Sequence, residues 1–145
     1  MSKKGDYVSG PGLKQLDSHA AIHEAALNEA IELNKLLAAL LKKGEKEKAL
    51  EVAYIAVEHW ETRTLRHAEA EEKGLYKELI EEFPELKDKI IALTRDHDIM
   101  RHIVKEIKQL LEREGFHVGV LERFYALVHV DQFHNEEEER ILPHH

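Results

Sequence analysis

The sequence predicts an all-α protein that folds as an antiparallel four-helix bundle with up-down-up-down topology. Only seven glycines and three prolines interrupt the 145 residues. Apolar residues recur with the 3.6-residue period of a helix over four long segments, and short turn signals separate these segments. A chain of this length is expected to form one domain with a single core.

The turn signals place the four helices. An arm, residues 1–12, is expected to precede the first helix, and the expected helices are 13–43, 45 into the 70s, 84–114 and 118–140. Gly44, Phe83-Pro84 and Gly115 mark the turns between them, because glycine ends helices and proline fits a first helical turn. The helical domain should cover 13–143, with a tail at 144–145. Core positions predicted from the period include Ile22, Ala26 and Leu37 on the first helix.

Composition excludes several classes of protein. The net charge is −8, and acids interrupt every Lys/Arg cluster, so no nucleic-acid partner is expected. No apolar run suits a signal peptide or a membrane span, so no membrane partner and a cytoplasmic location are expected. Without cysteine, any metal must be bound by histidine and carboxylate. The oligomeric state stays open.

A repeated His-x-x-x-Glu motif is the most informative local feature. It occurs as His67 with Glu71 and again as His134 with Glu138, and residues four apart share a helix face. Upstream of each copy, a further histidine interrupts an apolar helical pattern. The candidate metal ligands are therefore His19, His67, Glu71, His97, His134 and Glu138.

Loop positions predict that these six groups meet. In an up-and-down bundle with short loops, residues equidistant from a loop lie at the same height. The first lone histidine and the first His-Glu pair are centred on position 44. The midpoint between that pair and His97 is position 83. The midpoint between His97 and the His134-Glu138 pair falls at 116–117. All three positions fall at predicted turns, so the six groups are expected in one layer near the end that carries both termini.

The ordinary explanation for each residue is structural. A lone histidine on an apolar face is usually a core residue, and a glutamate in a polar run is usually solvated, as expected for Glu69, Glu72, Glu136 and Glu137. However, no Lys or Arg on the same faces balances the two inward carboxylates. Burying each carboxylate bare costs several kcal/mol. Bound metal would remove that cost.

The ligand set suits two irons better than one zinc. Zinc prefers about four tetrahedral ligands. Two bridging carboxylates with two imidazoles on each metal leave open positions, which can hold a bridging oxo or hydroxo group and an exogenous ligand. His23, one turn after His19, could be an additional or substitute ligand. His59 is expected to be peripheral, and His102 and His129 should face away from the site.

The chain resembles the hemerythrin-like, or HHE cation-binding, proteins from roughly Leu16 to Pro143. Four motifs carry the resemblance: Leu16-Asp17-Ser18-His19-Ala20-Ala21-Ile22, His67-Ala68-Glu69-Ala70-Glu71-Glu72, Arg95-Asp96-His97-Asp98-Ile99-Met100-Arg101, and His134-Asn135-Glu136-Glu137-Glu138-Glu139 followed by Ile141-Leu142-Pro143. The resemblance implies a four-helix bundle around a non-haem di-iron centre. It makes the four histidines terminal ligands and the two glutamates bridges.

The chain differs from the oxygen-carrying hemerythrins at two positions. Leu93 stands where those proteins have a further third-helix histidine, and Glu138 stands where they bridge through aspartate. The resemblance implies a protein that binds or senses dioxygen or nitric oxide, or holds iron. The alternative is a di-iron redox enzyme that decomposes hydrogen peroxide or oxidises iron, so whether the protein is an enzyme stays open.

Overall fold

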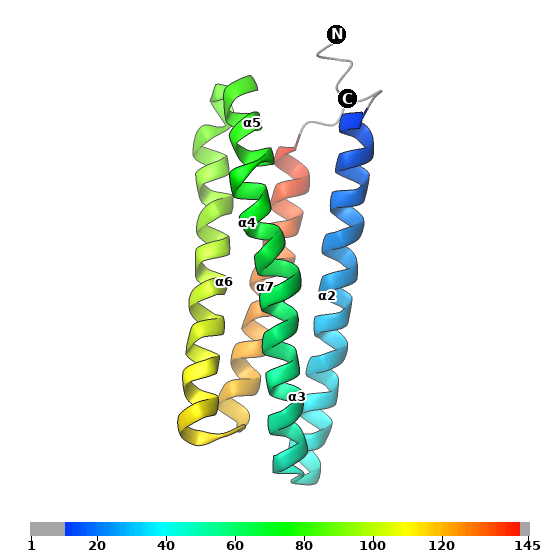
Figure 1. Cartoon of the computed structure of the whole chain (residues 1–145), viewed down its shortest axis with the longest axis vertical. Helices are drawn as coiled ribbons and strands as arrows, with labels where there is room; N and C mark the ends of the chain where they lie inside the picture. Colours follow the sequence, from blue (N-terminus) through cyan, green and yellow to red (C-terminus); the bar gives the residue numbers. More distant parts are fainter. Residues whose placement is uncertain (1–10, 143–145) are drawn as a thin grey trace.

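Four long helices pack side by side in the computed structural model, which describes residues 11–142 and side chains from residue 20 on (Figure 1). The elements are α2 (Pro11–Lys43), α3 (Lys46–His59), η1 (Trp60–Leu65), α4 (Arg66–Lys73), α5 (Leu75–Glu82), η2 (Pro84–Leu86), α6 (Lys87–Glu114) and α7 (Val118–Ile141). No strand occurs among residues 11–142. The predicted all-helical class is confirmed. Within that range, no helix combines the length and the apolar character that crossing a membrane requires.

The turns lie where the sequence predicts them. Gly44 and Gly115 follow α2 and α6 with φ of +72° and +76°, a backbone conformation that favours glycine. Pro84 begins η2, where its missing N–H costs no hydrogen bond. In Figure 1 both glycine turns lie at the lower end, and the Phe83-Pro84 turn lies at the upper end.

The first and second helices depart from the prediction in detail. Helix α2 begins at Pro11, inside the expected arm, whereas residues 1–10 and the tail at 144–145 lie outside the described residues. The second helix is not one continuous α-helix, because Trp60–Leu65 form a π-helical turn and Gly74 separates α4 from α5. A π-turn adds a residue to the helical repeat and so changes the direction in which the side chains after it point. His67 and Glu71 lie directly after this turn.

A polar layer divides the core into two apolar clusters. The larger cluster lies toward the glycine turns and includes Leu37, Ala53, Trp60, Ile107 and Phe124. The smaller cluster lies toward the other end and comprises Leu75, Tyr76, Leu79, Ile90, Leu93, Ile141 and Leu142. The polar layer between them contains His23, His67, Glu71, His97, Asp131, His134 and Glu138.

The inward face of α2 differs from the predicted one. Ala26, Ala30 and Leu37 are buried, but Ile22 is 45% exposed, so its predicted core position is wrong. The inward stripe reaches His23 rather than Ile22 at this height, because it continues from Ala30 and Ala26 by steps of four and three residues.

Candidate metal centre

The two His-Glu motifs place their side chains on the same faces of α4 and α7. His67 Nε2 lies 3.9 Å from Glu71 Oε2, and His134 Nε2 lies 3.5 Å from Glu138 Oε2. Glu71, His134 and Glu138 are buried, whereas His67 is half-buried. These spacings match the four-residue step along a helix from which the pairs were predicted.

His97 brings α6 into the same layer. Its Nε2 lies 3.1 Å from His134 Nε2 and 3.3 Å from Glu71 Oε1. The ring is buried, and its nearest imidazole neighbour belongs to α7. The structure therefore brings together five of the six predicted ligands.

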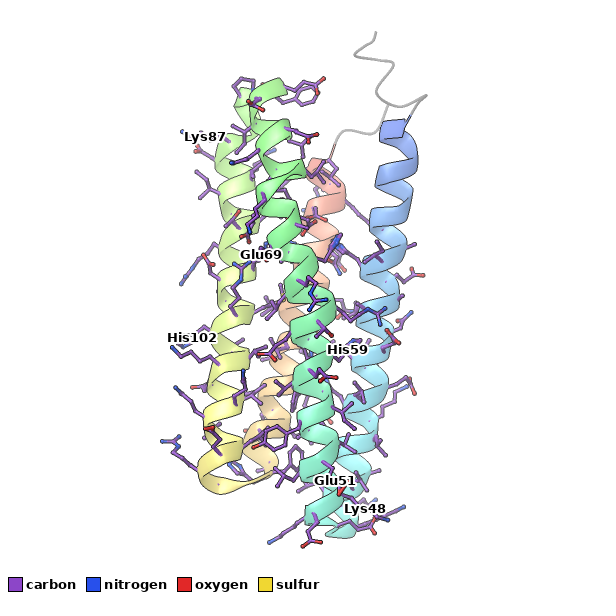
Figure 2. The ribbon with its side chains drawn as sticks, in the orientation of Figure 1. Lys48, Glu51, His59, Glu69, Lys87 and His102 are labelled. Carbon is purple, nitrogen blue, oxygen red and sulfur yellow. The ribbon has the colours of Figure 1, made fainter. Side chains whose placement is uncertain are left out.

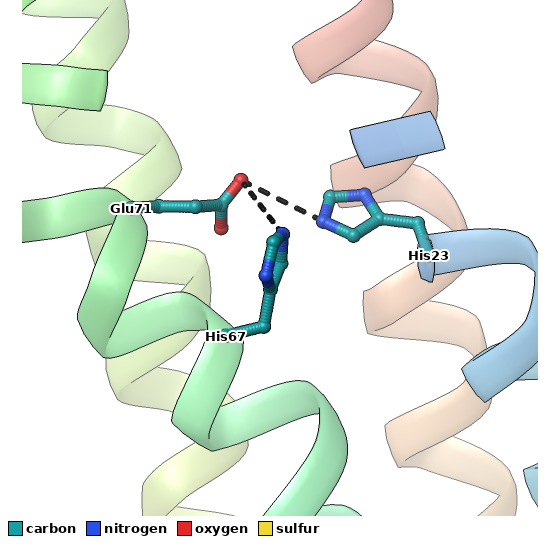
Figure 3. A group of neighbouring side chains, drawn as sticks. All are labelled: His23, His67 and Glu71. Atoms are coloured by element: carbon teal, nitrogen blue, oxygen red, sulfur yellow. Dashed lines mark ion pairs between the residues drawn. The ribbon is translucent and has the colours of Figure 1, made fainter. Parts of the chain in front are cut away.

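The first helix contributes His23. The backbone of His19 belongs to α2, but its side chain lies outside the described residues, so its role as a ligand stays a prediction. His23 Nε2 lies 3.6 Å from Glu71 Oε2, and its Nδ1 lies 3.5 Å from Glu138 Oε1. Figure 3 shows the rings of His23 and His67 converging on Glu71. His23, which the sequence left as an additional or substitute ligand, lies in the layer.

Each carboxylate faces imidazoles from more than one helix. Glu71 directs Oε2 toward the pair His23 and His67, and Oε1 toward His97. Glu138 directs Oε1 toward His23 and Oε2 toward His134. Two groups of donor atoms each lie within 4.8 Å of one another, and Glu71 belongs to both. The layer thus forms two adjacent sets of donors that share Glu71, and Glu138 faces one imidazole of each set.

Two further carboxylates orient the buried imidazoles. His97 Nδ1 donates to Glu72 Oε2 at 2.7 Å, and Arg101 holds the Glu72 carboxylate with contacts of 2.9 and 3.1 Å. His134 Nδ1 donates to Asp96 Oδ2 at 3.0 Å. A carboxylate on one ring nitrogen fixes the tautomer and directs the other nitrogen inward, as outer-shell partners of metal-bound histidines do.

The expected solvation of Glu72 is therefore wrong. Its side chain is 23% exposed and lies between α4 and α6, because one helical residue beyond Glu71 points about 100° away from it, toward the neighbouring helix. Asp96 was not predicted as a site residue either, because it directly precedes His97 and therefore points about 100° away from it on the helix. Arg101, four residues after His97, is the sequence signal that could have identified Glu72.

Tyr76 closes the layer from the side of α5. Its phenol donates a hydrogen bond to Glu138 Oε2, and its ring stacks on His97 with centroids 5.7 Å apart and planes 5° from parallel. Burial, together with the charges of Glu71 and Glu138, raises the pKa of Tyr76, so the phenol keeps its proton. No pattern in the sequence indicated this contact.

Burial and neighbouring charge also change the protonation of two α7 residues. Burial alone would lower the pKa of His134, but the hydrogen bonds to Glu138 and Asp96 raise it to about 9. Burial raises the pKa of the Asp131 carboxyl to about 6, although the nearby imidazoles of His23 and His134 act in the opposite direction. Asp131 was not predicted as a site residue.

Further histidines with described side chains lie apart from the layer. His102 and His129 are exposed, as expected, and Figure 2 shows His102 on the outer side of α6. His59, the last residue of α3, is half-buried, and its Nε2 lies 2.9 Å from the carbonyl oxygen of Ala26. It is therefore a structural residue.

Four imidazoles and two carboxylates form a donor set that fits two divalent or trivalent metal ions without a thiolate. The inward Nε2 atoms and the outward hydrogen bonds of His97 and His134 agree with that use. In comparisons with family models, curated proteins and solved structures, nothing matches the chain.

Proposed function

We propose that the polar layer binds two iron ions. His23 and His67 would hold one ion, His97 and His134 the other, and Glu71 and Glu138 would bridge them. The observation that carries this proposal is the position of Glu71, whose Oε2 faces His23 and His67 and whose Oε1 faces His97. One mononuclear site would not use both groups of donors.

The reason to propose iron rather than zinc is the open coordination positions that iron would keep. Two imidazoles and two carboxylate oxygens supply four ligands to each ion, which would complete a zinc site. Iron takes up to six ligands and so keeps positions for an exogenous molecule. Leu93, where oxygen carriers have a further histidine, is buried in the smaller apolar cluster one turn before His97 and adds no donor.

The proposed fold is the up-down-up-down bundle of the hemerythrin-like class, with donors from all four helices at one height. Bound iron supplies reversible one-electron chemistry toward dioxygen, nitric oxide or peroxide. The chain itself orients the donors through Glu72, Asp96 and Tyr76, and its smaller apolar cluster excludes water from one side. We therefore favour a protein that binds or senses dioxygen or nitric oxide, or holds iron.

A di-iron redox enzyme that decomposes hydrogen peroxide is the second candidate. When hydrogen peroxide disproportionates, one molecule is reduced to two waters and takes up the two electrons and two protons that a second molecule releases as it becomes dioxygen, so groups that hold protons near the layer would help. Asp131, a buried carboxyl with a pKa of about 6, keeps a proton close to the layer in mildly acidic solution. Tyr76 holds a second proton on its phenol oxygen.

Elemental analysis of protein from iron-replete cells tests the proposal. We expect close to two irons per chain, and His97→Ala should lose them whereas His102→Ala, altered on the exposed side of the same helix, should keep them. One zinc per chain, or no metal, would overturn the proposal. Stoichiometric spectral change with dioxygen or nitric oxide, compared with sustained hydrogen peroxide consumption, separates the two candidate functions.

A further inference from the structure

A cavity of about 340 Å³ lies between α2 and α7. Its lining includes Ala20, Ala21, His23 and Glu24 from α2, and Glu136 and Glu139 from α7. Five of these six residues are exposed and His23 is half-buried, so the cavity lies at the surface of the bundle.

His23 belongs both to this cavity and to the polar layer. It lines the cavity. Its Nδ1 lies 3.5 Å from Glu138 Oε1, and its Nε2 lies 3.6 Å from Glu71 Oε2. Among the six donors described, His23 and His67 have side-chain exposures of 14% and 21%, whereas the other four are at 3% or below. His23 and His67 are therefore the donors most accessible to solvent, and of these two His23 lines the cavity.

The walls of the cavity suit a small hydrated cation. Ala20 and Ala21 present only methyl groups, and the three glutamates carry negative charge, which raises the local concentration of cations. A divalent ion with six waters occupies roughly 180 Å³, at about 30 Å³ per water. The cavity has room for such an ion with its first hydration shell.

We propose that this cavity is the route by which a divalent metal ion reaches the polar layer, with His23 as the first imidazole that it meets. The ion exchanges its waters for the imidazole and carboxylate donors as it moves inward. This inference rests on the proposed function, because it requires that the layer binds metal.

A route residue and a ligand differ in a measurable way. Narrowing a passage slows uptake and release by the same factor, so the dissociation constant does not change. Losing a ligand changes the dissociation constant itself. Charge along the route acts mainly on the uptake rate and makes that rate sensitive to salt.

The experiment measures Co²⁺ uptake by the metal-free protein in stopped flow, and Co²⁺ release to a chelator. Ala21→Leu should slow both rates at least fivefold and leave the dissociation constant within twofold. Its control is Ala25→Leu, at an exposed α2 residue outside the cavity lining. The control should keep both rates within twofold.

A second variant tests the charge of the walls. Replacing Glu24, Glu136 and Glu139 together by glutamine should slow uptake at least fivefold at low salt and weaken its salt dependence. The control replaces Glu47, Glu51 and Glu58, exposed residues of α3, and changes the net charge equally.

Cavity variants that take up cobalt as fast as their controls would overturn the route. So would Ala21→Leu with an altered dissociation constant, because that result would make Ala21 a support of the donors. Absence of cobalt binding by the unaltered protein would instead overturn the proposed function and the route with it.

Discussion

The Nε2 atoms of His97 and His134 lie 3.1 Å apart, within hydrogen-bond distance, at the place proposed for a metal ion. Each Nδ1 already donates to a carboxylate, Glu72 or Asp96, so a hydrogen bond between the two Nε2 atoms requires a proton on one of them. The raised pKa of His134 assigns that proton to its ring. Metal binding must displace it.

The stability of the metal-free protein should therefore fall as pH rises from about 6.5 to about 9. The pKa of His134 is about 9 in the folded protein and 6.5 in its ordinary range, so its stabilising contribution is complete below 6.5 and lost as pH passes 9. The slope should be on the order of 1 kcal/mol per pH unit. Urea unfolding with chelator present measures it, and Asp96→Asn should reduce the slope. Stability that is constant or rises over this interval would contradict a proton held on the His134 ring.

Glu71→Gln should impair both metal positions at once. Its Oε2 faces His23 and His67, its Oε1 faces His97, and the residue belongs to both groups of donors, so removing the negative charge weakens each group. Cobalt titration should show at least a tenfold loss of affinity at both positions. Glu69→Gln, at an exposed residue of the same helix, is the control and should bind two ions normally. Loss of only one ion from the Glu71 variant would show that this carboxylate does not bridge.

Glu72→Gln and Asp96→Asn should weaken metal binding without changing its stoichiometry. These carboxylates contact the Nδ1 atoms of His97 and His134, whereas the Nε2 atoms are the ones proposed to bind metal. Loss of such a partner costs about 10- to 100-fold in affinity. The same cobalt titration should still reach two ions per chain. Unchanged affinity in both variants would mean that the contacts do not orient the imidazoles.

Tyr76→Phe should destabilise the metal-free protein by about 1 to 3 kcal/mol, because buried Glu138 loses a hydrogen-bond donor. Tyr125→Phe, at an exposed residue of α7, is the matched control and should change stability by less than about 0.5 kcal/mol. Chemical unfolding measures both. Equal stabilities for the two variants would indicate that the phenol does not hold Glu138.

The sequence predicted the turns well because Gly44 and Gly115 occupy backbone conformations that other residues rarely adopt. It predicted the convergence of five donors because loop spacing fixes relative height in a bundle. It selected His19 as the first-helix ligand and left His23, one turn further along the helix, as an additional or substitute ligand. Centring His23 and the first His-Glu pair gives position 46, and that also falls beside the turn.

Other features of the site could not be predicted from the sequence, because the 3.6-residue period of one helix carries no information about them. The π-turn at Trp60–Leu65 interrupts that period. Glu72 and Asp96 each lie next to a proposed donor in the sequence, so their facing depends on how closely α4 and α6 approach. Tyr76 reaches Glu138 from a separate helical segment, after the break at Gly74.

None of the six donors belongs to either apolar cluster. The larger cluster joins α2, α3, α6 and α7, so much of the packing between these helices is made by apolar residues outside the polar layer. Selection can consequently exchange histidine for carboxylate in the layer, one position at a time, while the frame persists. Such a bundle can be retuned toward another metal or another small ligand without a new fold.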